Sequence, residues 1–146
     1  MSLPYYQGPT GLRFECTRCG NCCTRPGVVY FSGDDLAQAA KQVGLTPAAF
    51  RRRYQIRQID GIPALDPGPH PCPFYAEEHG CTIYEARPTQ CRTWPFWPEV
   101  VRRRDSWERA GKECEGIGRG PRVPVREIEQ SIILCEDADL PEADPW

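Results

Sequence analysis

The sequence predicts a small α+β domain made of short strands or hairpins and three or four helices around cysteine-rich loops. Its 146 residues suit one domain with a hydrophobic core. The 16 prolines and 13 glycines make up about a fifth of the chain, which predicts many turns and short elements. Segments with helical and with strand-like apolar spacing both occur. We expect an extended, loosely held arm over residues 1–13 and the domain itself over residues 14–146.

A capping box marks the start of the first expected helix. The apolar run over residues 28–31 predicts a buried strand that ends directly before it. Ser32 has the position of the N-cap, and Asp35 follows three residues later to complete the box. Gly44 supplies the stop. The apolar residues at helical spacing between them are Leu36, Ala39, Ala40 and Val43.

A second helix is expected immediately afterwards. Thr46 is its N-cap and Pro47 its first residue, where the missing N–H of proline costs no hydrogen bond. Leu45 and Phe50 are spaced for a hydrophobic staple. This helix is expected to end at about Tyr54.

A hairpin should follow in the middle of the chain. Asp60-Gly61 is a turn signal between residues 55–59 and 62–65. Because Pro63 has no N–H to donate, we expect its strand at the edge of a sheet. The elements expected farther along are a loop over 66–73, short strands at 74–75 and 81–84, a helix over 99–110 and a last helix over about 124–136.

Nine cysteines carry the strongest chemical signal. Four of them lie within residues 16–23, and five follow at Cys72, Cys81, Cys91, Cys114 and Cys135. Thiols at this density form either a metal site or a disulfide framework. The N-terminus has no signal-peptide pattern and no apolar stretch approaches the length of a membrane span, so we expect a cytoplasmic protein. In a reducing compartment such clusters bind metal more often than they form disulfides.

Eight of the nine cysteines are expected to be metal ligands. Cys135 shares an apolar stripe with Val125, Ile128 and Ile132, so it is read as a small buried hydrophobe. The remaining eight suit two tetrahedral sulfur sites, which hold zinc or iron–sulfur centres. Adjacent side chains usually diverge, so we expect Cys22 and Cys23 to feed two different centres, or one of them to stay free. His70 and His79 are read as exposed, with ligation as the alternative.

Charge and aromatic clusters leave alternatives open. The net charge of −2 gives no support for nucleic-acid binding. The clusters Arg51–Arg53 and Arg102–Arg104 are read as solvated helix faces, with a patch for an acidic partner as the alternative. Arg87 and Arg92 would either neutralise thiolate charge or pair with a surface carboxylate at Glu85. The run over residues 94–98 should pack over the metal core, although a peptide-binding groove would also use such residues.

The combined pattern resembles a known family. The residues that carry the resemblance are Phe14-x-Cys16-x-x-Cys19-Gly20-x-Cys22-Cys23, Pro71-Cys72-Pro73-Phe74, Cys81-x-Ile83-Tyr84-Glu85-x-Arg87-Pro88-x-x-Cys91-Arg92, Pro95-Phe96 and Cys114-x-Gly116-Ile117-Gly118-x-Gly120. They are similar to the bacterial domain named for its Cys-x-x-Cys-x-x-Cys-Cys motif, a zinc- or iron-chelating domain. The departures, Tyr75 and Glu115, touch no cysteine position. The resemblance implies metal chelation by Cys16, Cys19, Cys22, Cys23, Cys72, Cys81, Cys91 and Cys114.

The resemblance implies less about activity. A metal-binding module holding zinc, iron or an iron–sulfur cluster is the leading hypothesis, with metal ions as its partners and no nucleic acid or membrane. One branch of the family is similar to flagellin lysine N-methylases, so the enzymatic alternative is an S-adenosylmethionine-dependent protein-lysine N-methyltransferase with an iron–sulfur cluster. A third alternative is a redox or metal sensor that acts through a protein partner. For the methyltransferase, a backbone nest at Gly116, Gly118, Arg119 and Gly120 is the tentative cofactor site, although a glycine turn before the last helix is favoured there.

Overall fold

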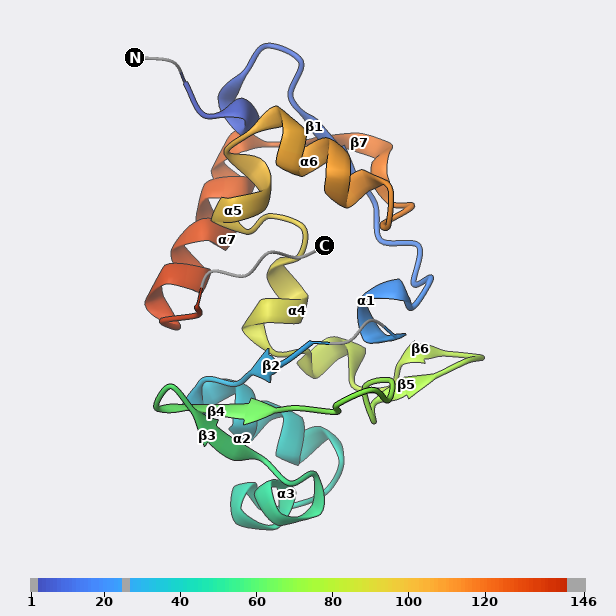
Figure 1. Ribbon diagram of the computed structural model, residues 1–146, viewed down its shortest axis with the longest axis vertical. Helices are drawn as coiled ribbons and strands as arrows, with labels where there is room; N and C mark the ends of the chain where they lie inside the picture. The colour runs from blue at the N-terminus through green and yellow to red at the C-terminus, as the bar shows by residue number, and fades with distance from the viewer. Residues whose placement is uncertain (1–2, 25–26, 142–146) are drawn as a thin grey trace. The chain divides into compact units, whose positions relative to one another are not determined.

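The structure is a computed structural model that describes residues 3–24 and 27–141. The chain forms two compact units. Unit 1 comprises Met1–Cys19 and Thr93–Trp146, and unit 2 comprises Gly20–Arg92, so the chain passes between them after Cys19 and after Arg92. Each unit contains helices and short antiparallel strands, which confirms the α+β class (Figure 1). The single domain over residues 14–146 stays a prediction.

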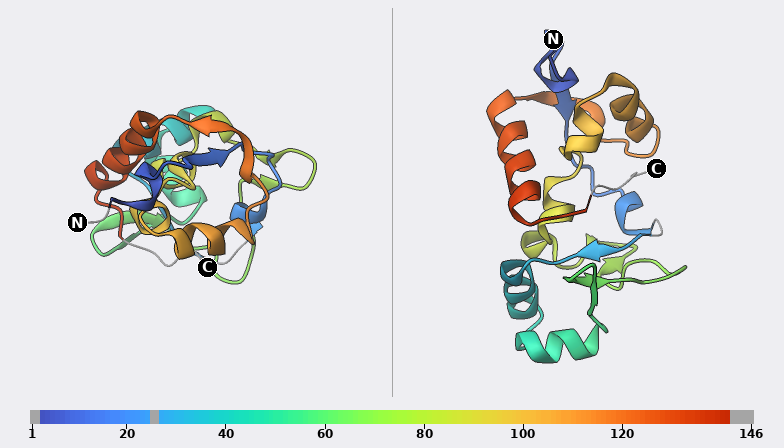
Figure 2. Two further views of the ribbon diagram at one scale, coloured as in Figure 1. Left: turned by 90° about the horizontal axis from the view of Figure 1, so that it is seen from above. Right: turned by 60° about the vertical axis from the view of Figure 1, so that its left-hand side comes forward.

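Two helices of unit 2 begin at the predicted caps. Helix α2, Gly33–Gln42, starts at the capping box: the Ser32 hydroxyl accepts from the Asp35 N–H, and the Asp35 carboxylate accepts from the Ser32 N–H, both at 3.0 Å. Helix α3, Pro47–Arg53, has Thr46 as its N-cap and Pro47 in its first turn. The two helices meet at a corner in the side view (Figure 2).

A three-stranded sheet accompanies these helices. Its strands are β2 (Val29–Tyr30), β3 (Arg57–Ile59) and β4 (Ile62–Leu65), in the order β2-β4-β3. The predicted hairpin joins β3 to β4 with Ile59 opposite Ile62. Asp60 and Gly61 both have positive φ, 53° and 78°, as a two-residue hairpin turn requires.

The position of Pro63 corrects a prediction. Its strand β4 lies in the centre of the sheet and not at an edge. The Pro63 carbonyl accepts from the Phe31 N–H at 2.8 Å, so this side of Pro63 faces the β2 segment. Strand β2 ends at Tyr30, one residue short of the position opposite Pro63. The missing N–H of proline therefore removes no hydrogen bond from the paired part of the sheet.

The other elements of unit 2 are short. They are α1 (Asn21–Thr24), β5 (Tyr75–Ala76), β6 (Gly80–Cys81), the 3₁₀ turn η2 (Tyr84–Ala86) and α4 (Thr89–Thr93), whose last residue already belongs to unit 1. Strands β5 and β6 form a separate antiparallel pair. The core of unit 2 centres on Phe50, whose ring contacts Phe31 at 6.0 Å and stacks on Phe74 at 5.8 Å between centroids.

Unit 1 combines one strand pair with helices. Its elements are the 3₁₀ turn η1 (Tyr5–Gln7), β1 (Leu12–Phe14), α5 (Pro98–Val101), α6 (Arg104–Gly111), β7 (Ile117–Val123) and α7 (Val125–Asp137). The expected loose arm is wrong for the described residues 3–13. Tyr6 and Leu12 are buried in the core of unit 1, and β1 pairs with β7. The pairing partner lies about a hundred residues away in the sequence, so no local pattern could reveal it.

The glycine run before the last helix is only partly the favoured turn: Gly116 lies in a turn, and Gly118 and Gly120 lie in a strand. This strand is β7, which is antiparallel to β1 (Figure 1). A Cβ at Gly116 would collide with the Glu15 carbonyl oxygen, and a Cβ at Gly120 would lie 2.7 Å from the Glu15 Cβ. These two glycines are therefore needed because the segment around Glu15 approaches the strand closely.

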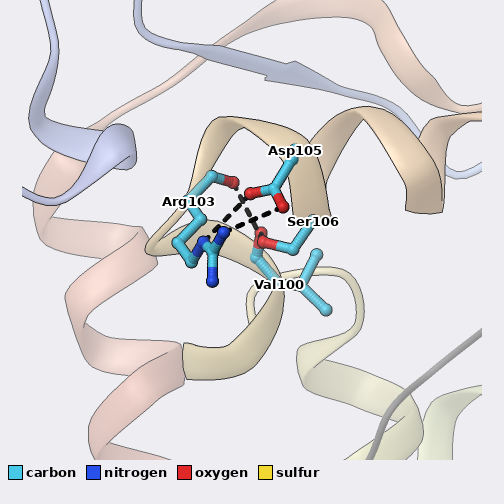
Figure 3. A network of polar contacts seen from close by, with 4 residues as sticks. All are labelled: Val100, Arg103, Asp105 and Ser106. Atoms are coloured by element: carbon cyan, nitrogen blue, oxygen red, sulfur yellow. Dashed lines mark hydrogen bonds and ion pairs between the residues drawn. The ribbon is translucent and has the colours of Figure 1, made fainter.

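A polar contact network fixes the corner between α5 and α6 (Figure 3). The Ser106 hydroxyl donates to the Val100 carbonyl at 2.9 Å and lies 3.0 Å from the Arg103 carbonyl. Arg103 pairs with Asp105 at 3.0 Å on the exposed side. The continuous helix predicted over residues 99–110 is thus two short helices, because residues 102–103 form the corner between them.

Helix α7 has the predicted bounds within one residue. Ile128, Ile132 and Cys135 are buried, as the apolar stripe predicts, but Val125 is 39% exposed. Val125 is the first residue of the helix and lies beyond the core that covers the rest of the stripe. Within the described residues, no helix combines the length and apolar character that crossing a membrane requires.

Candidate metal centres

The two units divide the cysteines between them. Unit 2 contains Cys22, Cys23, Cys72, Cys81 and Cys91, and unit 1 contains Cys16, Cys19, Cys114 and Cys135. All nine lie among the described residues and are free cysteines. The chemistry of each group is therefore built within its own unit.

A tight turn at Gly20 presents the first two thiols of unit 2. Gly20 has a φ of 82°, which only glycine adopts without strain. Its carbonyl accepts from the N–H groups of Cys23 and Thr24 at 3.0 and 3.1 Å, and this starts the single turn of α1. The Tyr75 ring from β5 covers the glycine so closely that a Cβ there would collide with it. The backbone conformation of Gly20 thus sets the start of α1 and, with it, the positions of Cys22 and Cys23.

The thiol of Cys23 is the centre of a four-cysteine group. It hydrogen-bonds with the thiols of Cys22, Cys72 and Cys81. The Cys72 N–H donates to the Cys23 carbonyl at 2.8 Å, which ties the proline-flanked loop to α1. The adjacent side chains of Cys22 and Cys23 were expected to diverge and to serve different centres, or one of them to stay free, yet their thiols hydrogen-bond with each other.

The four thiols share their protons unequally. The hydrogen bond from Cys23 is the main cause that lowers the pKa of Cys22 to about 7, against burial, which raises it. The same kind of bond from Cys23, together with the Phe74 N–H, lowers the pKa of Cys72. The pKa of Cys23 is raised, mainly because its thiol keeps its proton in the hydrogen bonds with Cys22, Cys72 and Cys81. The group therefore favours thiolates at Cys22 and Cys72, and a bound cation would displace the remaining protons.

Cys91 lies beside this group, and two side chains fix its helix. The buried Asp35 carboxylate accepts from the Thr89 N–H and hydroxyl, both at 3.0 Å. Gln90 bonds the β2 segment at two points, accepting from the Tyr30 N–H and donating to the Val28 carbonyl, both at 3.0 Å. Burial and the nearby thiolates raise the pKa of Cys91, so its thiol keeps its proton.

Arg87 brings positive charge to the same region. Its guanidinium lies 3.8 Å from the centroid of the Tyr84 ring, and its Nε donates to the Tyr84 carbonyl at 2.8 Å. Its charge acts to lower the pKa of Cys22 and of Cys91. Arg92 instead donates to the Thr89 hydroxyl at 3.2 Å. Arg87 therefore fits the interpretation of a cation that offsets thiolate charge.

Cys114 in unit 1 has a preformed set of hydrogen-bond donors. Its sulfur accepts from the Trp94 side chain and from the backbone N–H groups of Gly116 and Ile117, although burial raises the pKa of Cys114 overall. Backbone N–H groups directed at sulfur stabilise a thiolate ligand. Trp94 also joins the core of unit 1, so the aromatic run packs beside a cysteine of the predicted ligand set.

The segment with Cys16 and Cys19 runs beside Cys114. The Glu15 N–H donates to the Gly116 carbonyl at 3.1 Å, and the Thr17 hydroxyl contacts the Glu115 carboxylate. The charge of Cys19 is one of the causes that raise the pKa of Cys114. Cys16 and Cys19 are exposed, whereas Cys114 is buried. Cys16, Cys19 and Cys114 of unit 1 thus lie on two backbone segments that run beside each other.

Other candidate residues lie elsewhere. Cys135 is buried on α7, with its sulfur 3.2 Å from the Thr93 hydroxyl, as expected for a core residue. His70 and His79 are exposed. The predicted cofactor residues Gly116, Gly118, Arg119 and Gly120 lie in or next to β7, and their cofactor role stays a prediction. In the part of the chain that the structure describes, no three His, Cys, Asp or Glu side chains are already arranged as the ligand shell of an ion.

Comparison with known proteins identifies the family. Residues 15–115 match the profile of the CxxCxxCC family, described as "Putative zinc- or iron-chelating domain". The chain belongs to this family. The matched range includes all eight cysteines predicted as ligands and ends before Cys135. No curated protein and no solved structure matches the chain. Membership in the CxxCxxCC family supports metal binding and names zinc and iron equally.

Several residues that shape the centres were not found from the sequence. Asp35 was predicted only as part of a helix cap, yet it also fixes the start of the Cys91 helix. Gln90 carried no motif signal for its role, and Trp94 was predicted to pack over the metal core but not to donate a hydrogen bond to Cys114. All three act through contacts more than 15 residues apart, which spacing patterns do not encode. The sequence around Asp35 indicates a helix cap, and the sequence around Trp94 indicates a proline-rich turn. Neither pattern reveals the distant residue that each side chain contacts.

Proposed function

We propose that this chain chelates zinc or iron through cysteine sulfur, with one centre in each unit. The observation that carries the proposal is the contact of the Cys23 thiol with the thiols of Cys22, Cys72 and Cys81. Four sulfurs from three separate segments meet around Cys23, and a site with four sulfur ligands suits zinc or an iron–sulfur centre.

The unit 2 centre uses Cys22, Cys23, Cys72 and Cys81 as ligands. The donor set fits, because sulfurs on a zinc ion with Zn–S bonds of about 2.3 Å are roughly 3.8 Å apart in a tetrahedron, which is within reach of thiols in mutual contact. Cys91 supplies a fifth, protonated sulfur beside the group. Arg87 offsets the excess negative charge that four thiolates bring to a divalent cation.

The unit 1 centre uses Cys16, Cys19 and Cys114. The hydrogen bonds to the Cys114 sulfur support it as a thiolate ligand, and the close contact at Gly116 keeps the Cys16 segment beside it. The Cys-x-x-Cys spacing of Cys16 and Cys19 allows one loop to hold an ion from two sides.

The bound metal is a structural element of the fold. The cysteine loops of unit 2 contain few backbone hydrogen bonds of regular secondary structure, since α1, β5 and β6 span two to four residues each. Ligand bonds that do not exist in the unfolded chain add directly to the free energy of unfolding. The metal therefore adds to the stability that the hydrophobic core around Phe50 gives to unit 2.

The test is the content of zinc, iron and acid-labile sulfide in protein purified without oxygen. We expect zinc or iron in every preparation of the native chain. Cys23→Ser should lose bound metal, because it removes the shared contact of the four-thiol group. Cys135→Ser is the matched control and should keep the native metal content. A metal-free native chain, or equal metal in native and Cys23→Ser protein, would overturn the proposal.

Sulfide content distinguishes the two metals. Iron with matching sulfide indicates a cluster, whereas zinc without sulfide indicates mononuclear sites. The methyltransferase and sensor alternatives stay predictions.

A further inference from the structure

A cavity of about 450 Å³ opens on unit 2, and no cysteine is among its lining residues, although Pro71 and Pro73 flank Cys72. It is lined by the end of α3, by β3 and by the proline-rich loop, and the lining residues are Arg53, Tyr54, Gln55, Arg57, Leu65, Asp66, Pro67, His70, Pro71 and Pro73. Its volume is in the range of small-molecule sites in proteins, about 300–1,000 Å³.

Rigid residues form the apolar part of this cavity. The Tyr54 ring is held against Phe50 and Phe74, at 4.8 and 4.6 Å between centroids. Leu65 is buried at the end of β4. The three prolines of the lining have restricted backbones, so the wall changes little in shape. A flat ring or an apolar body would find a preformed surface here.

Charge in the cavity is unequally paired. Asp66 is engaged twice, by the Arg57 guanidinium at 2.9 Å and by the Gly68 N–H at 2.9 Å. The Arg53 guanidinium lies over the Tyr54 ring, 5.9 Å from its centroid, and has no carboxylate or hydrogen-bond partner among the described residues. Arg53 is therefore a lining cation that remains unpaired beside the Arg57–Asp66 ion pair.

We infer that this cavity binds a small organic anion, with its carboxylate or phosphate on Arg53 and its planar body against Tyr54. The planar guanidinium matches either group with two parallel hydrogen bonds. Arg57 adds a second positive charge close by, and its pairing with Asp66 fixes its position. Of the three arginines in the cluster Arg51–Arg53, only Arg53 lines the cavity, so the inference rests on that side chain.

The test uses phenyl phosphate and benzoate as probes on the full chain as purified. Binding is followed by the ¹⁵N–¹H signals of Gln55 and Arg57, which line the cavity. We expect both signals to shift in a saturable way. Inorganic phosphate, which has no ring, should bind at least about tenfold more weakly. A shift with phenyl phosphate alone would identify phosphate as the preferred group, and a shift with benzoate alone would identify carboxylate.

Two matched variants complete the test. Arg53→Gln should weaken binding at least about tenfold, the loss expected when one charge-assisted contact is removed. Arg52→Gln removes the same charge one residue away, outside the cavity, and should leave binding unchanged. Absence of saturable shifts at millimolar probe would overturn the inference, and so would equal weakening by the two variants. Metal content is measured separately, so a negative result here leaves the chelation proposal unaffected.

Discussion

Gly20 is the residue on which the geometry of α1 depends. Its backbone is in the left-handed region, and a Cβ would collide with the Tyr75 ring. We expect Gly20→Ala to lower the free energy of unfolding by about 1–3 kcal/mol, from backbone strain and displacement of the ring. Gly33→Ala is the control, because Gly33 has open space around its Cα and no positive φ. Urea denaturation of both variants measures the difference, and equal stabilities would contradict this role of Gly20.

Cys135 gives a pH-dependent prediction that does not involve metal. Burial raises the pKa of its thiol. Below the unfolded-state pKa of about 8.5, both states keep the proton and the contribution of Cys135 to stability is complete. As the pH rises further, the unfolded chain loses this proton before the folded chain does, so the free energy of unfolding falls. The stability difference between native protein and Cys135→Ala should therefore shrink from about pH 8 to about pH 10.

The measurement is denaturant unfolding of the two proteins under reducing conditions across this range. Other titrating groups are common to both proteins, so their effects largely cancel in the difference. A stability difference that stays constant or grows with pH would show that the Cys135 thiol is not shielded from water.

At the scale of elements, Asp35 joins α2 to α4. Its carboxylate accepts hydrogen bonds from the Ser32 N–H and from the Thr89 N–H and hydroxyl in a buried position. Asp35→Ala would leave three donors without this acceptor, and the two donors of Thr89 are in buried hydrogen bonds, so we expect a loss of about 2–3 kcal/mol in the free energy of unfolding. Asp34→Ala is the control, since Asp34 is exposed in the same first turn and should cost at most about 1 kcal/mol. Similar losses in the two variants would argue against the link.

The same elements show what sequence patterns can predict. The caps at Ser32 and Thr46 and the turn at Asp60-Gly61 were predicted correctly because the chemistry that fixes them lies within four residues. The pairing of β1 with β7 and the central place of β4 were not, since both depend on which distant strand becomes the neighbour. Pro63 shows this well: its missing N–H excludes a hydrogen bond at one position but does not exclude a central strand.

At the scale of the whole molecule, the sequence predicts which cysteines are ligands but not how they are grouped in the fold. Spacing marked Cys16–Cys23 as one motif, yet the chain passes from unit 1 to unit 2 directly after Cys19. Cys22 and Cys23 consequently meet Cys72 and Cys81, which lie about 50 residues further along. Candidate cysteine ligands can be counted from the sequence, but assigning them to separate metal centres requires the tertiary fold.

Together with the proposed chelation, this division predicts that two bound metals can be lost independently. Cys23→Ser should remove the metal of unit 2 and Cys114→Ser that of unit 1, so each single variant keeps part of the native metal content and the double variant keeps none. Because each bound metal stabilises mainly its own unit, each variant should also show a lower thermal transition than Cys135→Ser. A strong chelator added to native protein should lower the transition further than either single substitution, because it removes both metals. Metal analysis and calorimetry on the four proteins test this, and complete loss of metal from Cys23→Ser alone would instead indicate one centre that serves the whole chain.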